Sequence, residues 1–207
     1  MTALITDKEI MTALDAIAKR DRHVREAILQ VGYPAPRNRP MGFETLMGII
    51  VGQQVSTAAG NAIRGRLAEA VAPLTPEQYL ATHEDALRAA GLSARKVDYG
   101  RGLAEAMCDG ELCDDDLHTL DDHDVIKEIT AIRGLGRWSA EIYLMFAMKR
   151  PDVWPAEDLA VAEALRRLKG LDERPDRKTS EALVEPWRPY RSFGALFLWH
   201  YYQGAPT

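Results

Sequence analysis

Apolar residues recur at helical spacing along almost the whole chain, and no stretch shows the sustained period-two alternation of a half-buried strand. Glycine and proline separate the helical stretches, most clearly in the segment Gly32–Pro40 and around Gly52. The pattern predicts an all-α fold whose 207 residues form one domain or two small lobes. We expect helices at about 4–19, 22–31, 43–71 (two helices around Gly52), 76–80, 83–90, 93–108, 121–131, 138–148, 159–168, 180–184 and 190–202.

The composition indicates a soluble protein. Hydrophobic residues make up 46% of the chain and charged residues 28%, values that are ordinary for a globular domain. No run of 18 apolar residues exists to span a membrane, and residues 1–8 lack the basic and apolar regions of a signal peptide. Cys108 and Cys113 are too few for a disulfide framework or an iron–sulfur cluster. We therefore expect a cytoplasmic protein, associated with the nucleoid if it is bacterial.

The charge is unevenly distributed along the chain. The formal net charge is −5, but eight acids and no Lys or Arg lie between Asp109 and Asp124. The remaining 23 acidic residues face 26 basic ones, a net charge of +3. Because the local field steers a partner more than the total charge does, the net value does not exclude a nucleic acid. We expect the acidic stretch to be a solvated loop, with His118 and His123 exposed in it.

The segment Ile132-Arg133-Gly134-Leu135-Gly136-Arg137 lies between two predicted helices and is typical of a helix–hairpin–helix at about 128–148. Two helices reverse over so few residues only if some φ angles are positive, which glycine permits. Leu135 can pack back between the helices. The missing Cβ atoms would let a phosphate approach the amides from Arg137 onward, a natural anion site. An ordinary helical turn with two glycines remains the alternative.

Asp158 directly precedes the predicted helix at 159–168, in the run Pro155–Leu159. Asp is a favoured N-cap, so a purely structural role is one interpretation. The second is catalytic, since amides at a helix start favour an ionised carboxylate, which can stabilise a developing sugar cation. The two roles are compatible.

Four segments together resemble the helix–hairpin–helix (HhH-GPD) DNA glycosylases, and most closely the AlkA-like 3-methyladenine DNA glycosylase II branch. They are Ile49-Ile50-Val51-Gly52-Gln53-Gln54-Val55-Ser56, Gly91-Leu92-Ser93-Ala94-Arg95-Lys96, the hairpin with its Asp158 loop, and Pro186-Trp187-Arg188-Pro189-Tyr190-Arg191-Ser192. The resemblance runs from about Phe43 to Tyr202. It implies a two-lobe helical fold with an active-site cleft between the lobes. Residues 1–40 with 151–207 would form one lobe and 41–150 the other, with no room for the extra N-terminal sheet domain of the larger AlkA enzymes.

The resemblance also implies a reaction. Asp158 would be the catalytic carboxylate of a base-excising glycosylase. Members that also cut the backbone carry a Schiff-base Lys two positions after the second hairpin glycine, where this chain has Trp138. We therefore expect a monofunctional enzyme that acts on alkylated purines such as 3-methyladenine and 7-methylguanine, with ethenoadenine as a further candidate. A non-catalytic lesion-binding protein of the same fold, and more remotely a helical protein–protein module, are the alternatives.

The remaining expectations concern individual residues. An extruded base needs aromatic faces to stack on, and the candidates are Trp138, Trp187, Tyr190 and Trp154, each with a core role as the alternative. The expected DNA-binding residues are Arg133, Gly134, Leu135, Gly136, Arg137 and Ser139. Gln54 occupies the family's wedge position, where it would fill the hole left by the flipped nucleotide or hydrogen-bond the widowed base; for Gln53 we favour helix-end polar contacts.

No cofactor and no catalytic metal are expected, although the resemblance suggests a structural Na⁺ or K⁺ near the carbonyls of Ile132 and Leu135. The expected partner is double-stranded DNA containing damaged bases, bound by a monomer, and no membrane.

Overall fold

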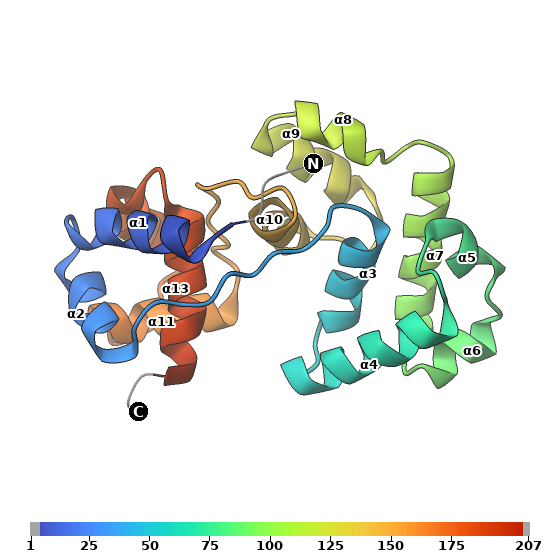
Figure 1. Cartoon of the computed structure of the whole chain (residues 1–207), viewed down its shortest axis with the longest axis horizontal. Helices are drawn as coiled ribbons and strands as arrows, with labels where there is room; N and C mark the ends of the chain where they lie inside the picture. Colours follow the sequence, from blue (N-terminus) through green and yellow to red (C-terminus); the bar gives the residue numbers. More distant parts are fainter. Residues whose placement is uncertain (1–4, 205–207) are drawn as a thin grey trace. The chain divides into compact units, whose positions relative to one another are not determined.

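The computed structural model describes residues 5–204, and every regular element within that range is a helix (Figure 1). This confirms the expected all-α fold. The chain divides into two compact units. The terminal unit comprises the described residues of Met1–Asn38 and Lys149–Thr207, and the central unit comprises Arg39–Met148. No helix between residues 5 and 204 combines the length and the hydropathy needed to cross a bilayer.

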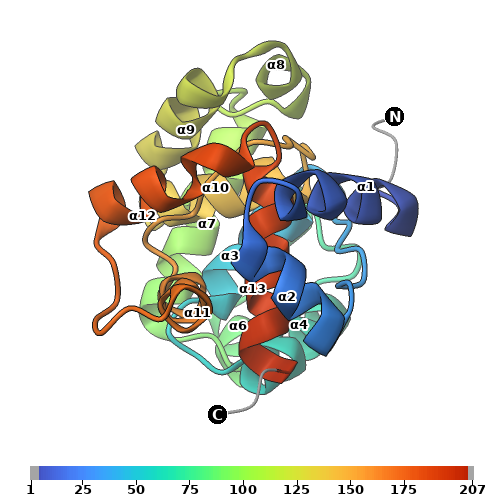
Figure 2. The same cartoon turned by 90° about the vertical axis from the view of Figure 1, so that its left-hand side faces the viewer.

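The terminal unit is organised around its last helix, α13 (Arg191–Gly204), which packs against α1, α2 and α11 (Figure 2). Its interior comes from helical rows such as Ile10, Leu14 and Ile17 of α1, all fully buried. Burying each such side chain contributes roughly 1.5–3 kcal/mol, so this packing holds α1 against the rest of the terminal unit, including α13. The other elements are α1 (Asp7–Ala18), α2 (Arg22–Val31), α11 (Leu159–Lys169), α12 (Arg177–Val184) and the 3-10 helix η1 (Glu185–Trp187).

A buried carboxylate joins three parts of the terminal unit. Asp21 is the N-cap of α2 and accepts a hydrogen bond from the amide of His23. It also pairs with Lys169 at the end of α11 and accepts a hydrogen bond from Nε1 of Trp187, at 2.7 Å. Burial tends to raise the pKa of Asp21, but the bonds from Lys169 and Trp187 outweigh it and hold that pKa below its ordinary value.

The central unit surrounds α3 (Phe43–Gly52), which packs against α4, α7 and α10 (Figure 1). Eight of the ten residues of α3 are buried, and a helix that is apolar on all sides is a core helix. The other elements are α4 (Thr57–Ala70), α5 (Pro76–Ala81), α6 (Glu84–Ala89), α7 (Ala94–Cys108), α8 (Asp114–Thr119), α9 (Asp122–Ala131) and α10 (Arg137–Phe146).

The expectation that the acidic stretch is a solvated loop is wrong in part. The stretch contains α8, which buries Leu117, and the first turn of α9. Asp114 accepts a hydrogen bond from the hydroxyl of Tyr143 at 2.9 Å, and that hydroxyl accepts one from the amide of Gly42 at 2.8 Å. Burial raises the pKa of both Asp114 and Tyr143. Asp114 is thus half-buried and hydrogen-bonded, whereas the other seven acids are exposed or half-buried, and two of them, Asp109 and Glu111, lie before α8.

Candidate active site

Gly134 determines the shape of the hairpin between α9 and α10. Its φ is +95°, in the region that favours glycine. A Cβ atom on Gly134 would lie 2.3 Å from Cγ of Tyr99, on α7. Both the backbone angle and the close ring exclude a side chain here.

Gly136 has a different function in the hairpin. Its φ of −91° and ψ of 179° are extended and open to any residue, so the positive φ that the turn requires is at Gly134 and not here. Apart from Gly136 itself and its two chain neighbours, no heavy atom of the described residues lies within 4 Å of where its Cβ would be. Gly136 is the N-cap of α10 and has no side chain with which to cap it. The start of α10 can therefore be approached closely, and its amides carry partial positive charge.

The hairpin interior is held by Leu135 and Gln53. Leu135 is buried, and its packing between the two helices stays a prediction. Gln53, just after α3, donates from Nε2 to the carbonyl of Gly134 at 2.9 Å and to Oγ of Ser139 at 3.5 Å. The side chain of Gln53 therefore reaches across to the hairpin, while its backbone amide makes the expected helix-end contact, donating to the carbonyl of Ile50 at 3.3 Å as the C-cap of α3. Because the Ser139 side chain is buried, its hydroxyl is not a surface DNA contact, and the prediction for Ser139 reduces to its backbone amide.

Arg133 and Arg137 are both exposed at the hairpin. Arg133 pairs with Asp98 at 2.9 Å, and its guanidinium lies 5.7 Å from the ring centroid of Tyr99. Arg137 pairs through Nε with the buried carboxylate of Glu141 at 2.9 Å. Exposed ion pairs contribute little, so Arg133 can exchange Asp98 for a phosphate at small cost. A phosphate contact by either arginine stays a prediction.

Gln54 lies at the exposed tip of the turn between α3 and α4, with a φ of +56°. This left-handed conformation is costly for a residue with a side chain and persists only where its surroundings enforce it. Lys96 supplies part of that support, because its Nζ donates to the carbonyls of Val51 and Gln53, both at 2.8 Å. Gln53, the residue before the wedge candidate Gln54, is hydrogen-bonded to the hairpin, so the position of Gln54 depends on that contact.

Asp158 is the N-cap of α11, as the sequence predicts. Its Oδ1 accepts the amide of Val161 at 2.9 Å, which is the expected capping bond. The same oxygen accepts Nε1 of Trp199 at 3.2 Å. The side chain of Asp158 is half-buried. It is therefore a fixed, partly accessible carboxylate at a helix N-terminus.

Trp199 is the residue that reasoning from the sequence missed. It lies on α13, 41 positions from Asp158 in the chain, and only the packing of α13 on α11 brings the two together. The guanidinium of Arg37 lies 5.9 Å from the centroid of the Trp199 ring. The period of an apolar helix gives no sign that one tryptophan will meet a distant carboxylate, so no pattern in the sequence would have found this bond.

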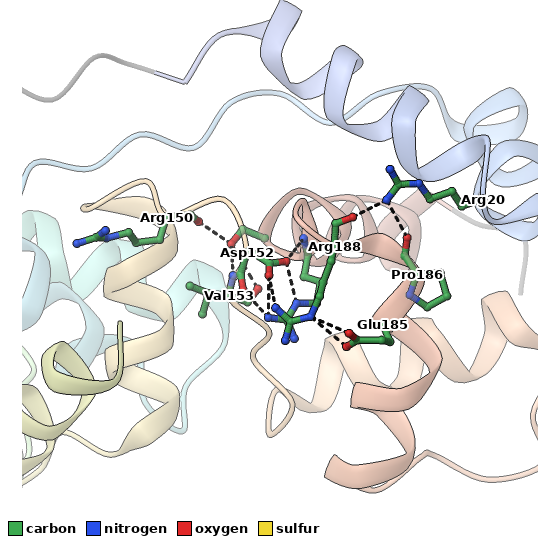
Figure 3. Close-up of polar contacts among 9 residues, drawn as sticks. Arg20, Arg150, Asp152, Val153, Glu185, Pro186 and Arg188 are labelled. Atoms are coloured by element: carbon green, nitrogen blue, oxygen red, sulfur yellow. Dashed lines mark hydrogen bonds and ion pairs between the residues drawn. The ribbon is translucent and has the colours of Figure 1, made fainter. Parts of the chain in front are cut away.

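A network around Asp152 anchors the segment that leads to Asp158 (Figure 3). The carboxylate of Asp152 accepts bonds from Arg188 at 2.7 Å and from Nε and Nη2 of Arg191 at 2.8 and 2.9 Å. Oγ of Ser192 donates to the carbonyl of Arg150 at 2.7 Å and accepts the amide of Val153 at 2.9 Å. Two-pronged arginine–carboxylate pairs are geometrically specific. The network therefore fixes the chain before Asp158 against the start of α13.

The predicted base-pocket residues in the terminal unit divide into two groups. Trp187 is completely buried and bonded to Asp21, and Trp154 is buried with its Nε1 donating to Oγ of Ser180 at 3.1 Å. The two rings meet edge to face, with centroids 5.8 Å apart. Both are core aromatics, so we correct the expectation that they line a base pocket. Tyr190 is only half-buried and contacts Phe193 edge to face.

The predicted residues are therefore distributed over both units. The hairpin, Gln54 and Trp138 belong to the central unit, with Trp138 half-buried as the second residue of α10. Asp158, Trp199 and Tyr190 belong to the terminal unit. The central unit thus carries the elements suited to gripping a backbone, and the terminal unit carries the carboxylate.

These features match a known family. A family model described as HhH-GPD superfamily base excision DNA repair protein matches residues 47–189. The chain belongs to the HhH-GPD superfamily. That match covers most of the chain and includes the hairpin, Gln54 and Asp158.

Relatives of this HhH-GPD protein agree with the resemblance seen in the sequence. DNA-3-methyladenine glycosylase 1 of Schizosaccharomyces pombe is 32% identical over 212 aligned residues, covering 96% of this chain and 92% of that protein. DNA-3-methyladenine glycosylase 2 of Escherichia coli is 26% identical, covering 86% of this chain and 65% of that protein. A solved structure of S. pombe 3-methyladenine DNA glycosylase (Mag1) with abasic DNA superimposes with a TM-score of 0.85 at 28% identity, covering 94% of this chain and 98% of that one.

Proposed function

We propose that this HhH-GPD protein is a monofunctional DNA glycosylase that removes alkylated purines from double-stranded DNA and leaves an abasic site. The observation that carries the proposal is Asp158, a half-buried carboxylate held at the start of α11 by two N–H donors. The similarity to 3-methyladenine glycosylases supports 3-methyladenine and 7-methylguanine as substrates, with ethenoadenine as a further candidate.

The reaction begins with extrusion of the damaged nucleotide. Extrusion costs a few kcal/mol of stacking, and Gln54, exposed at its turn, would recover part of that cost by filling the gap. Trp138 of the central unit and Tyr190 of the terminal unit, both half-buried, stay the aromatic candidates for stacking on the extruded base. Many alkylated purines are cationic, and an indole face attracts a cation by about 0.5–2 kcal/mol.

The chemical step breaks the bond between C1′ and the purine nitrogen, and the electron pair leaves with the base. Because a cationic purine is already a good leaving group, the reaction needs no general acid. Asp158 would stabilise the positive charge that develops on the sugar, activate the attacking water, or do both. Water oxygen then bonds to C1′ and loses a proton, which gives the free base and an abasic sugar.

Trp138 supports hydrolysis without strand cutting. It occupies the position where bifunctional relatives carry a lysine that forms a Schiff base with the sugar, and an indole cannot form one. The Trp138→Lys variant is not expected to gain lyase activity, because a lysine nucleophile also needs a pocket that keeps it neutral. Trapping with borohydride measures this directly, and a covalent adduct in that variant would contradict the reasoning.

We expect the protein to bind DNA as a monomer and to contact the DNA backbone through the hairpin. A phosphate would lie against the first amides of α10, where Gly136 leaves the approach open. The carbonyls of Ile132 and Leu135 are oxygen donors of the kind that hold Na⁺ or K⁺, and an ion there would add positive charge beneath the phosphate. Ile132 already accepts the Leu135 amide at 3.1 Å, so an ion would use the second lone pair of that carbonyl.

The direct test uses duplexes that carry a single 7-methylguanine or ethenoadenine, followed by treatment with hot alkali. Strand breaks that appear only after alkali are the expected result. Breaks without alkali would contradict the absence of lyase activity. Tight binding of the lesion duplex with no breaks under any condition would instead favour a non-catalytic lesion-binding protein.

A further inference from the structure

The turn between α3 and α4 has a conformation that its sequence does not favour. Gln53 has a φ of −64° and a ψ of 131°, and Gln54 follows with a φ of +56°. These angles are close to those of a type II turn, whose third residue is normally Gly or Asn because its φ is positive. A glutamine there carries strain that a glycine would avoid. Since the Gln54 side chain is exposed, packing does not require it, and the strain indicates a functional need for that side chain.

A conformation without this strain lies one peptide rotation away. Turning the peptide group between Gln53 and Gln54 by about 180° converts a type II turn into a type I turn, in which Gln54 would have a φ of about −90°. This rotation mainly redirects the carbonyl of Gln53 and the amide of Gln54. A group that holds the Gln53 carbonyl therefore also holds the φ of Gln54.

Lys96 is that group. Its Nζ donates to the carbonyls of Gln53 and Val51, both at 2.8 Å, and a hydrogen bond from an ionised donor is roughly twice as strong as a neutral one. Lys96 is the third residue of α7, and a cation is unfavourable near the N-terminus of its own helix. Its ammonium reaches the carbonyl end of α3, where a cation is favourable, so the lysine serves the turn after α3.

The same contact sets the direction of the next amide. In a trans peptide the N–H and the C=O point in opposite directions, so the N–H of Gln54 points away from the Lys96 ammonium. In the type I form this N–H would face the ammonium, with two donors opposed. The Gln53 side chain is fixed separately by its bond to the Gly134 carbonyl. The orientation of the peptide group is therefore determined by Lys96.

We propose that Lys96 is a positioning residue for base extrusion, which keeps the turn in its type II form so that Gln54 is preformed to enter the gap left by the extruded nucleotide. This rests on the proposed wedge role of Gln54. A turn that already has its bound conformation loses less conformational freedom when DNA binds. Without the ammonium the turn relaxes to a negative φ at Gln54, and binding to a duplex with a missing base must order it again.

The binding test measures affinity for an abasic-site duplex relative to the same duplex without damage. Lys96→Met keeps the apolar stem and removes the ammonium. The matched control is Arg101→Met, because Arg101 is also a cation of α7 that donates to two main-chain carbonyls, those of Leu80 and Thr82. We expect Lys96→Met to lower the preference for the abasic duplex by about tenfold, whereas Arg101→Met and the conservative Lys96→Arg keep it within about threefold.

A double-mutant cycle separates positioning from a general effect on the fold. In Gln54→Gly the wedge is absent and a positive φ carries no strain, so adding Lys96→Met should lower the preference by less than about twofold more. All affinities are measured below the melting temperature of each variant. Full additivity of the two changes would overturn the proposal, and so would an unaltered preference in Lys96→Met.

The conformation is tested without DNA, by crystal structures of the unaltered protein and of Lys96→Met. We expect a positive φ at Gln54 in the first and a negative φ in the second, and a positive φ in both would contradict the proposal. Neither test requires a base to be removed. If both effects are seen and no alkylated duplex is cut, the proposed glycosylase reaction fails and the role of Lys96 stands.

Discussion

Gly134→Ala should lower the free energy of unfolding for two separate reasons, and neither reason applies to Gly136→Ala. At a φ of +95° a residue with a Cβ costs about 1–2 kcal/mol. The new methyl would also lie 2.3 Å from Cγ of Tyr99, and such overpacking typically costs about 1–3 kcal/mol. The sum is about 2–5 kcal/mol, which lowers the melting temperature by about 5–20 °C in a chain of this size.

Thermal unfolding followed by circular dichroism measures these costs. Gly134→Ala should show the full loss, and a double-mutant cycle with Tyr99→Ala should recover the steric part and leave the backbone part. Gly136→Ala should change stability by less than about 0.5 kcal/mol, because its φ of −91° is ordinary and its surroundings are open.

Affinity for DNA, unlike stability, should be reduced by the alanine at Gly136. A methyl there stands in the approach to the first amides of α10, so we expect Gly136→Ala to weaken binding of abasic-site duplex by about tenfold, or about 1.4 kcal/mol. Equal loss of stability from the two alanines would refute the assignment of separate roles. Unchanged binding by Gly136→Ala would refute the phosphate site.

Three further predictions concern the supports of the site. Asp21→Asn should lower the free energy of unfolding by about 3 kcal/mol, since it removes the carboxylate that pairs with the largely buried Lys169. The folded pKa of Asp21 is lowered, so its contribution to stability is present above the unfolded pKa of ~3.9 and is lost as the pH falls through the folded pKa. Denaturant titrations should therefore show a smaller stability difference between Asp21→Asn and the unaltered protein at pH 3 than at pH 7. Asp152→Asn should lower both stability and the single-turnover rate, as it releases two arginines, whereas Glu185→Gln, which removes only an exposed pair, should alter neither by more than about twofold or 0.5 kcal/mol. Gln54→Gly relieves a positive φ, so it should leave stability unchanged or raise it by up to about 1 kcal/mol while slowing excision, and a normal excision rate would exclude the wedge role.

Features that depend on local sequence were predictable. The helical periods, the hairpin glycine at 134 and the cap at Asp158 each follow from residues within a few positions of one another. Their physical causes are backbone sterics and helix-end hydrogen bonding, which the local sequence largely specifies. Gly136 shows the limit of that reasoning, because only the structure reveals that its φ is ordinary and that its use is open space.

Features that depend on packing across the chain were not predictable. The burial of Trp154 and Trp187 follows from where the N-cap of α2 and the start of α12 lie, which no local pattern encodes. The bond between Trp199 and Asp158 needs the register of α13 on α11. The prediction of a loop at residues 109–124 was wrong in part because it rested on charge alone, whereas the segment around the buried Leu117 forms the helix α8.

The most direct test of the account is single-turnover excision of 7-methylguanine by Asp158→Asn. Asparagine can still cap α11 through its side-chain oxygen, so the variant should keep its melting temperature to within a few degrees. The account predicts that excision falls to the limit of detection while affinity for abasic-site duplex stays within a few fold of the unaltered protein. Excision at the unaltered rate by the folded variant would contradict the claim that Asp158 performs the chemistry.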